Sequence, residues 1–312
     1  MAKRNWKTVL GACLIKAAEK HKNLVLVSAD SGPNSGFEEF IAKFPTRFFE
    51  FGIMEPSVTC VASGMATAGL LPVFCAPAPF ITGRAYEMVR IDIGYMRQNV
   101  KLIGRNAGFS YSDLGPTHYG LDDIGLIRLI PDVVLLAPQF ADELESAFEA
   151  MMDYEGPIYM RVCNSSLPDI GEKEPFVIGK GKVLAEGGDV AIIATGNRTH
   201  CVLEALPLLH EHGINPMIIG MPTIIPIDVD LVKKAAELGK VVTVEEHFVD
   251  GGFGTIVADT LATHCPAKLL KLGVPNEYAT SGGYDEMAEF YGLDASGIAK
   301  TVCEFVKNSP RA

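Results

Sequence analysis

The chain has 312 residues, of which 48% are hydrophobic, and its formal net charge is -11 at pH 7. This charge argues against a nucleic-acid or anionic-membrane partner, because both need basic patches to neutralise phosphate. The length exceeds that of a usual single domain, so we expect two domains that share an interface. The high hydrophobic content predicts a subunit that buries a large face against a partner chain.

The N-terminal segment has the spacing of an amphipathic helix. Its apolar residues recur every three or four positions: Trp6, Val9, Leu10, Cys13, Leu14 and Ala17. Lys16, Glu19 and Lys20 interrupt the apolar stretch, so the pattern predicts a helix rather than a signal peptide. No apolar run in the sequence reaches the roughly twenty residues that a membrane span needs.

Cysteine usage indicates a reducing compartment. The seven cysteines form no Cys-x-x-Cys pair, and several lie in apolar runs, as Cys60 and Cys75 do. This distribution predicts buried thiols rather than disulfides. Together with the N-terminal pattern, it predicts a cytoplasmic protein.

Short apolar runs alternate with helical stretches along the whole chain. The runs cover residues 24–29, 100–103, 133–136, 158–162, 190–194, 216–219 and 241–244. This alternation predicts an α/β fold with two consecutive domains, each a mostly parallel sheet flanked by helices. Residues 165–182 are rich in proline, glycine and charge, so we place the boundary near Gly171, between domains 1–170 and 171–312.

Glu55 is the first candidate functional residue. It opens an Ala/Gly/Ser-rich helical run from Pro56 to Gly69, and proline is well tolerated in a first helical turn. Taken alone, this pattern favours an acid that only complements the helix dipole. His118 follows a loop rich in glycine, serine and aspartate. Asp30, residues 106–118 and Asn164 all follow apparent strands, so they are candidates to line a common cleft at the carboxyl ends of those strands.

Several segments, in order, resemble the C-terminal half of transketolase, which carries the pyrimidine-binding and C-terminal domains. They are residues 27–30 (VSAD), 51–57 (FGIMEPS), Phe80 with 83–86 (GRAY), and 115–118 (GPTH) with 130–132 (IPD) and 137–138 (AP). Residues 251–254 (GGFG) and 273–278 (GVPNEY) resemble the C-terminal domain of the same family and of the deoxyxylulose-phosphate synthases. The resemblance covers nearly all of the chain.

The resemblance implies thiamine diphosphate chemistry and assigns four residues to it. Glu55 would hydrogen-bond the pyrimidine ring of the cofactor and help to activate it, and His118 would serve as general acid or base during transfer of a two-carbon ketol unit from a ketose to an aldose. Phe80, expected in a loop, would stack on the aminopyrimidine. Asp30 would approach the thiazolium side. The alternatives are core packing for Phe80, a loop-fixing hydrogen bond for His118 and a turn residue for Asp30.

One motif of the family is missing from this sequence. Family members bind Mg²⁺ and the diphosphate through a Gly-Asp-Gly motif followed by an Asn on a separate N-terminal domain, and no Gly-Asp-Gly occurs here. We therefore expect a split transketolase, with an N-terminal-half partner subunit that holds the metal and the diphosphate. An α2β2 assembly is expected, with no metal ligand on this chain.

The positions that handle the sugar in phosphate-specific relatives differ here. The aligned residues are Asn34, Asn106, Leu114 and Asn164, where the family carries a serine, a histidine, an aspartate and an arginine. Amides make weaker hydrogen bonds to phosphate than charged groups do. With His118, these residues predict a site for a sulfonated or unphosphorylated sugar.

The sequence leaves the roles of two arginines and of two short segments, residues 245–247 and 251–254, undecided. Arg105 or Arg161 is a candidate to restore a cation near the sugar. The triplet 245–247 (Glu-Glu-His) lacks zinc-like partners and predicts ionised surface or interface groups. Residues 251–254 are expected to form a packing turn, although such a turn is also able to hold an anion.

Two other functions are compatible with the sequence. The β subunit of a 2-oxoacid dehydrogenase shares the two-domain plan and a pyrimidine-contacting glutamate, but the Gly-Pro-Thr-His segment argues against it. A non-catalytic scaffold or regulatory subunit would keep the fold without turnover, and the presence of both Glu55 and His118 argues against that.

Overall fold

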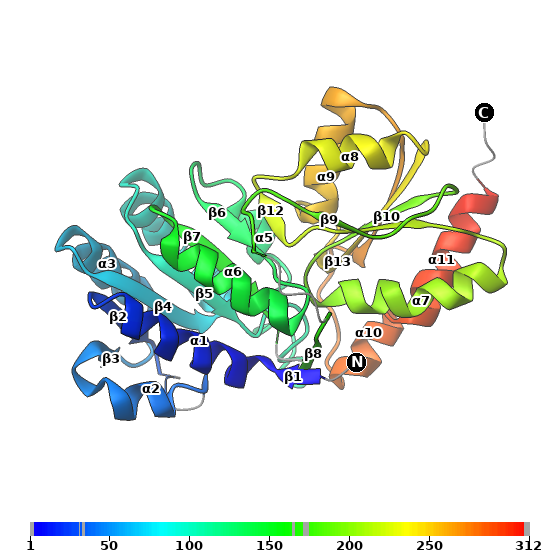
Figure 1. Cartoon of the computed structure of the whole chain (residues 1–312). Helices are drawn as coiled ribbons and strands as arrows, with labels where there is room; N and C mark the ends of the chain where they lie inside the picture. The colour runs from blue at the N-terminus through cyan, green and yellow to red at the C-terminus, as the bar shows by residue number, and fades with distance from the viewer. Residues whose placement is uncertain (1–2, 31, 33–34, 164–165, 171–174, 309–312) are drawn as a thin grey trace.

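The structure is a computed structural model that describes residues 3–30, 32, 35–163, 166–170 and 175–308. Two parallel-rich sheets lie side by side, each covered by helices on both faces (Figure 1). The α/β class with two consecutive units is therefore confirmed. The expected boundary at Gly171 lies outside the described residues and stays a prediction.

The larger sheet has seven strands in the order β12-β6-β7-β5-β4-β2-β3, and only the pairing of β12 with β6 is antiparallel. Its strands are β2 (Leu24–Ser28), β3 (Phe48–Glu50), β4 (Leu71–Pro77), β5 (Lys101–Arg105), β6 (Val134–Leu136), β7 (Ile158–Val162) and β12 (Thr223–Ile225). The inner strands are buried on both faces, which explains their continuous apolar runs.

Helices cover both faces of this sheet. One face carries α1 (Trp6–Lys20), α2 (Glu38–Lys43), the turn η2 (Pro45–Arg47) and α6 (Ala141–Asp153). The other carries α3 (Glu55–Thr67), α4 (Tyr86–Met88), α5 (Asp123–Ile127) and two π-helical segments, η3 (Phe80–Arg84) and η4 (Val89–Tyr95). The predicted N-terminal helix is confirmed, and Asn5 caps it by accepting a hydrogen bond from the Lys7 N–H at 2.9 Å.

The smaller sheet has five strands in the order β14-β13-β10-β11-β9, with β9 antiparallel. They are β9 (Lys182–Ala185), β10 (Ala191–Ala194), β11 (Met217–Gly220), β13 (Lys240–Phe248) and β14 (Lys268–Val274). The turn η5 (Gly196–Arg198), α7 (Thr199–Glu211), α10 (Tyr284–Phe290) and α11 (Ala295–Lys307) lie on one side; α8 (Val229–Ala236) and α9 (Phe253–His264) lie on the other.

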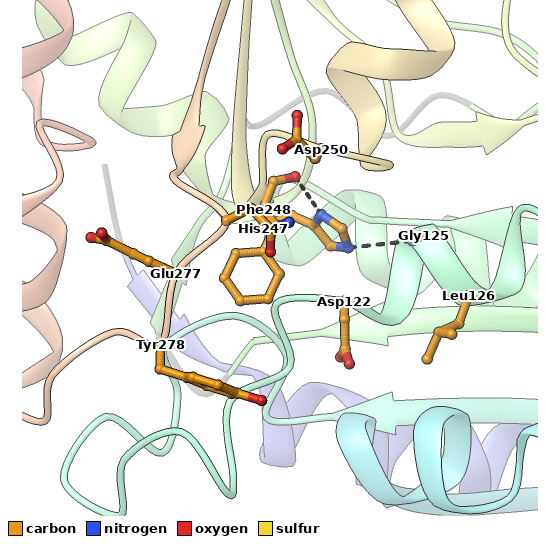
Figure 2. A pocket seen from close by; sticks show the side chains of 9 residues that line it. Asp122, Gly125, Leu126, His247, Phe248, Asp250, Glu277 and Tyr278 are labelled. Carbon is orange, nitrogen blue, oxygen red and sulfur yellow. Dashed lines mark hydrogen bonds between the residues drawn. The ribbon is translucent and has the colours of Figure 1, made fainter.

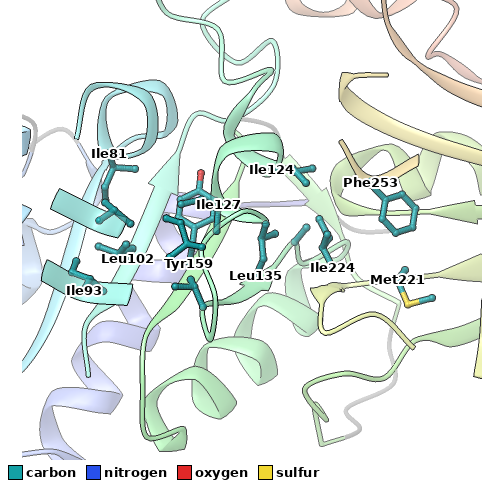
Figure 3. Close-up of a cluster of buried hydrophobic side chains, with 14 of the residues drawn as sticks. Ile81, Ile93, Leu102, Ile124, Ile127, Leu135, Tyr159, Met221, Ile224 and Phe253 are labelled. Atoms are coloured by element: carbon teal, nitrogen blue, oxygen red, sulfur yellow. The ribbon is translucent and has the colours of Figure 1, made fainter. Parts of the chain in front are cut away.

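The two halves share one hydrophobic core. Ile124 and Leu135 of the first half pack in the same cluster as Met221, Ile224 and Phe253 of the second (Figure 3). Phe253 is fully buried, and burial of one such side chain contributes about 1.5–3 kcal/mol. A small antiparallel sheet of β1 (Lys3–Asn5) and β8 (Ser166–Pro168) joins the two ends of the first half to each other. Loops from both halves are thus held in fixed positions.

Two local predictions are wrong. Phe80 is not in a loop, because Phe80–Arg84 form a π-helical turn. Cys60 is exposed, because the buried face of α3 passes through Thr59 and Ala62 and leaves Cys60 beside the Asp92 carboxylate, with Sγ and Oδ2 3.1 Å apart. Among the described residues, no helix has both the length and the apolar character needed to cross a bilayer.

Candidate functional site

Glu55 lies at the first position of α3, with Pro56 next to it. The side chain of Glu55 is almost fully buried, and its Oε2 accepts a hydrogen bond from Nη1 of Arg84 at 2.9 Å. Helix N-termini favour a carboxylate. The Arg84 side chain is 42% exposed, so the partner of this buried carboxylate is itself in contact with solvent.

Arg84 also connects Glu55 to two rings. Its guanidinium lies over the ring of Phe80, 3.9 Å from the centroid. The Phe80 ring meets the His118 ring edge-on, with centroids 5.3 Å apart and an interplanar angle of 74°. The π-helical turn η3 places Phe80 and Arg84 four residues apart on one wall, and such turns are frequent at functional sites.

The contacts continue beyond His118 into the loop at residues 106–118. The ring of Tyr111 packs edge-on against His118 at 5.8 Å, and the Tyr111 hydroxyl accepts a hydrogen bond from Nη1 of Arg105 at 2.8 Å. Nδ1 of His118 lies 2.9 Å from Oγ1 of Thr117. We call the six residues Glu55, Arg84, Phe80, His118, Tyr111 and Arg105 the site line. It joins a carboxylate to an imidazole through aromatic contacts.

The loop that carries His118 is fixed from the C-terminal half. Glu246 of β13 accepts a hydrogen bond from the Phe109 N–H at 2.7 Å. The Tyr119 hydroxyl lies within hydrogen-bond distance of the carbonyl oxygens of Ser112 and Thr280, which belong to different halves. The catalytic candidate His118 therefore depends on the interface between the halves for its position.

Asp30 does not belong to the site line. It is exposed, has a φ of 58°, and its N–H donates to Oε1 of Glu50 at 2.6 Å. Burial opposes ionisation of Glu50, but the N–H groups of Asp30, Gly52 and Gly32 hold its pKa below the ordinary value. Glu50 thus organises the turn after β2, and the turn role expected as the alternative for Asp30 is the one these contacts support.

The structure describes two of the four expected sugar-binding asparagine and leucine residues. Asn34 and Asn164 lie outside the described residues. Asn106 is buried, has a φ of 55°, and its Oδ1 has no hydrogen-bond partner in the described part of the chain. Leu114 is exposed and lies one residue before Gly115, in the loop that leads to His118.

The structure gives different surroundings to Arg105 and Arg161, the two candidates for a cation near the sugar. Arg161 is buried at the interface, where its Nε lies 3.0 Å from the Asp123 carboxylate and its Nη2 donates to the carbonyl oxygens of Gly120 and Glu246. Burial opposes its charge, but Asp123 holds the pKa of Arg161 above its ordinary value. Arg161 is therefore a structural ion-pair residue, and Arg105 is the arginine on the site line.

The triplet at 245–247 is buried rather than on the surface. Glu245 accepts hydrogen bonds from the N–H groups of Phe253 (2.6 Å) and Gly254 (2.8 Å) at the start of α9, so an internal carboxylate fills the glycine-rich turn. The turn thus packs against the protein's own acid. The triplet lies where the two halves meet, so its expected place on the surface is wrong, and the expected ionised state is wrong for His247, whose pKa burial lowers to about 4. Charged triplets are usually exposed, and these are buried because the halves meet over them.

An open pocket of about 520 Å³ lies beside His247, between α5 and the turn after β13 (Figure 2). Nδ1 of His247 lies 2.8 Å from the Phe248 carbonyl oxygen, and Nε2 accepts from the Gly125 N–H at 3.3 Å. Burial lowers the pKa of His247 to about 4, so the ring is neutral. No residue of the site line lines this pocket.

The possible metal ligands that lie together are elsewhere. Among the described residues, the ligand atoms of His200, Cys201 and Glu204 lie within 4.8 Å of one another on α7. Nδ1 of His200 contacts the Asn197 carbonyl oxygen. These residues belong to the C-terminal half, and none of them is on the site line.

Sequence reasoning missed three residues of this site. Arg84 lies within a segment that the resemblance uses, yet its pairing with Glu55 depends on the π-helical turn. Tyr111 lies in an irregular loop without periodicity. Glu246 acts across the interface, and no local pattern reports a contact between residues 137 positions apart.

Comparisons with known proteins agree with this architecture. The family model for the transketolase pyrimidine-binding domain matches residues 2–169, and that for the transketolase C-terminal domain matches residues 179–298. The fold is thus that of the pyrimidine-binding and C-terminal domains of thiamine-dependent enzymes. The chain belongs to the transketolase family.

Three relatives have nearly the same length as this chain. An apulose-4-phosphate transketolase subunit of Phocaeicola vulgatus is 36% identical over 94% of this chain and 95% of its own. A putative transketolase C-terminal section of Methanocaldococcus jannaschii is 36% identical, covering 95% of each chain. A solved structure described as a split gene transketolase, inactive β4 tetramer, superimposes with a TM-score of 0.90 at 32% identity, covering 97% of this chain and 99% of that one.

Proposed function

We propose that this chain is one subunit of a split, thiamine diphosphate-dependent transketolase that moves a two-carbon ketol unit from a ketose to an aldose. The observation that carries the proposal is the site line, in which a buried carboxylate, an aromatic ring and an imidazole follow one another in contact. When bound, thiamine diphosphate supplies the nucleophilic carbon and the electron sink for this reaction.

The residues present fit the pyrimidine end of that cofactor. Glu55 offers a buried carboxyl group for a ring nitrogen, and Phe80 offers an aromatic face beside it. Arg84 holds Glu55 in the free chain and is exposed enough to move aside. Nε2 of His118 is the candidate that accepts and returns a proton at the sugar, since an imidazole nitrogen serves both as a general base and as a general acid.

A partner subunit is part of the proposal. The sequence has no Gly-Asp-Gly motif for Mg²⁺ and diphosphate, and large apolar side chains are exposed around the start of α3 and on η4: Ile53, Met54, Ile91, Tyr95 and Met96. An exposed apolar patch of this kind marks an interaction site. The related β4 tetramer is described as inactive, which supports an α2β2 enzyme whose other chain holds the metal and the diphosphate.

The proposal also specifies the class of sugar substrate. We infer a sulfonated or unphosphorylated ketose, because Asn106 replaces an ionisable residue and Leu114 replaces an acid at the positions that handle sugar phosphates in the resembling enzymes. The apulose-4-phosphate transketolase relatives are named for a phosphorylated sugar. A phosphorylated ketose is therefore the natural comparison substrate.

The proposal is tested on this chain alone and on its co-purified complex with the partner subunit. Calorimetric titration of thiamine diphosphate and Mg²⁺ should show binding to the two-chain complex and not to this chain alone. The loaded complex should then transfer a ketol unit from at least one ketose, with sulfonated or neutral ketoses preferred over phosphorylated ones. Tight cofactor binding by the isolated chain would contradict the split site.

A further inference from the structure

Arg105 is a buried cation without a balancing charge. It ends β5, its residue is 6% exposed, and its Nε has no hydrogen-bond acceptor among the described residues. Within the same part of the chain it has no carboxylate at ion-pair distance, whereas Arg161, which lies opposite Gly104 on neighbouring β7, pairs with Asp123 at 3.0 Å. An unpaired buried charge is strongly unfavourable, so such a group points to a ligand.

The next residue presents a second unsatisfied group. Oδ1 of Asn106 is buried and has no donor in the described part of the chain. Buried side-chain oxygens are nearly always hydrogen-bonded in folded proteins. A guanidinium N–H and an amide oxygen on consecutive residues, each without a partner in the described part of the chain, match a ligand that has an anionic group and a hydroxyl group.

The position of Arg105 suits the remote end of a sugar bound at His118. Ile103, two residues earlier on β5, packs in the core cluster under α1 and α6, so Arg105 emerges on that side of the sheet at the carboxyl end of the strand. Ligands of parallel sheets bind at this end. Tyr111 bridges the two residues, since its hydroxyl contacts Arg105 and its ring contacts His118.

We propose that Arg105 binds a singly charged oxyanion, a sulfonate or a carboxylate, at the end of the sugar remote from the reacting carbon. This inference rests on the proposed function and narrows its substrate class. One cation balances one negative charge, whereas a phosphate monoester carries about -1.5 to -2 charge at pH 7 and leaves an excess. Asn106 adds an acceptor for a hydroxyl group but no charge.

The anion site is testable without turnover, because Arg105, Asn106 and Tyr111 all belong to this chain. Calorimetry at pH 8 and constant ionic strength measures the binding of ethanesulfonate, propionate and ethyl phosphate to the full chain. At least one of the two singly charged probes should bind more tightly than ethyl phosphate. The difference in affinity between ethanesulfonate and propionate then tells whether the site prefers a sulfonate or a carboxylate. Arg105→Met should weaken that binding tenfold or more, since hydrogen bonds to charged groups are the strong ones.

Lys101→Met is the matched control. Lys101 is a buried lysine on the same strand and the same face, but at the opposite end, where its Nζ donates to the carbonyl oxygens of Tyr154 (2.6 Å) and Gly156 (2.8 Å) and where burial lowers its pKa to about 7. This variant should bind the probes as the unmodified chain does. The inference is overturned if Arg105→Met binds them equally well, if no probe binds, or if ethyl phosphate binds most tightly.

Steady-state kinetics of the complex with the partner subunit provide a second test. Arg105→Met should raise KM for a sulfonated or carboxylated ketose at least tenfold, with a smaller effect on kcat, and should raise KM for a neutral ketose by a much smaller factor. Anion binding without ketol transfer from any ketose would contradict the proposed function and leave the anion site intact. Transfer from charged ketoses with the same KM in Arg105→Met would contradict the anion site alone.

Discussion

The Phe109 N–H donates to Oε1 of Glu246 at 2.7 Å, and this contact fixes the loop of His118 to the C-terminal sheet. Oε2 of the same carboxylate accepts from Arg198 (Nε, 2.5 Å) and from Asn197 and Tyr284, both at 2.8 Å. A glycine is required beside it, because a Cβ at residue 108 would lie 1.9 Å from Oε1. The C-terminal half thus takes part in positioning the site.

Replacing Glu246 with Gln should lower the free energy of unfolding by about 3–5 kcal/mol, because Arg198 would keep a buried charge without its partner. Denaturant titration of the full chain measures the change. Asp259→Asn is the matched control: it breaks the ion pair with Arg128, in which the aspartate is exposed, and should cost less than about 1 kcal/mol. Equal effects of the two substitutions would contradict the role assigned to Glu246.

The same carboxylate predicts a pH dependence. Burial opposes its ionisation, but Arg198, Asn197, the Phe109 N–H and Tyr284 hold the pKa of Glu246 below its ordinary value of 4.5. A folded-state pKa below the unfolded one gives stability that is present above pH 4.5 and is lost as the pH falls through the folded value. The unmodified chain should therefore lose more stability than Glu246→Gln between pH 5 and pH 3. Parallel pH profiles for the two proteins would contradict this.

The parts of the fold that the sequence predicts are those with a local cause. The apolar runs of β2 and β7 and the helical spacing of α1 can each be recognised in a short, continuous stretch of sequence. The predicted apolar runs leave out β4, which contains two prolines, β14, in which lysines interrupt the apolar run, and short strands such as β1 and β3. Glu246 is misread for a related reason, since its partners come from distant segments and its neighbours look like a surface triplet.

Glu55→Gln should reduce ketol transfer by the two-chain complex about a hundredfold or more, because an amide is a far weaker acid or base than a carboxyl group at the pyrimidine ring. The measurement is the initial rate at saturating cofactor. Glu87→Gln, an exposed acid on the neighbouring helix α4, should leave the rate unchanged. A near-normal rate for Glu55→Gln would remove this residue from the proposed mechanism.

Phe80→Ala should weaken thiamine diphosphate binding to the complex by up to about tenfold. The ring is half-buried and holds Arg84 on one face, and an aromatic contact contributes about 0.5–1.5 kcal/mol. Calorimetric titration in the presence of Mg²⁺ measures the affinity. Phe290→Ala, which removes an exposed ring from α10, serves as the control and should bind the cofactor normally. Unchanged affinity in both variants would assign Phe80 to packing alone.

Tyr95→Asp should weaken association with the partner subunit while leaving this chain folded. Tyr95 lies on η4, is 82% exposed, and belongs to the apolar patch beside the start of α3, so a carboxylate there would be desolvated only when the partner binds. Sedimentation velocity of the mixed subunits measures the loss of complex, and circular dichroism checks the fold. Phe290→Asp provides the comparison, since it places the same charge on an exposed aromatic position of the C-terminal half. If both substitutions left the complex intact, the patch would not be the interface; if only Phe290→Asp disrupted it, the partner would bind the C-terminal half instead.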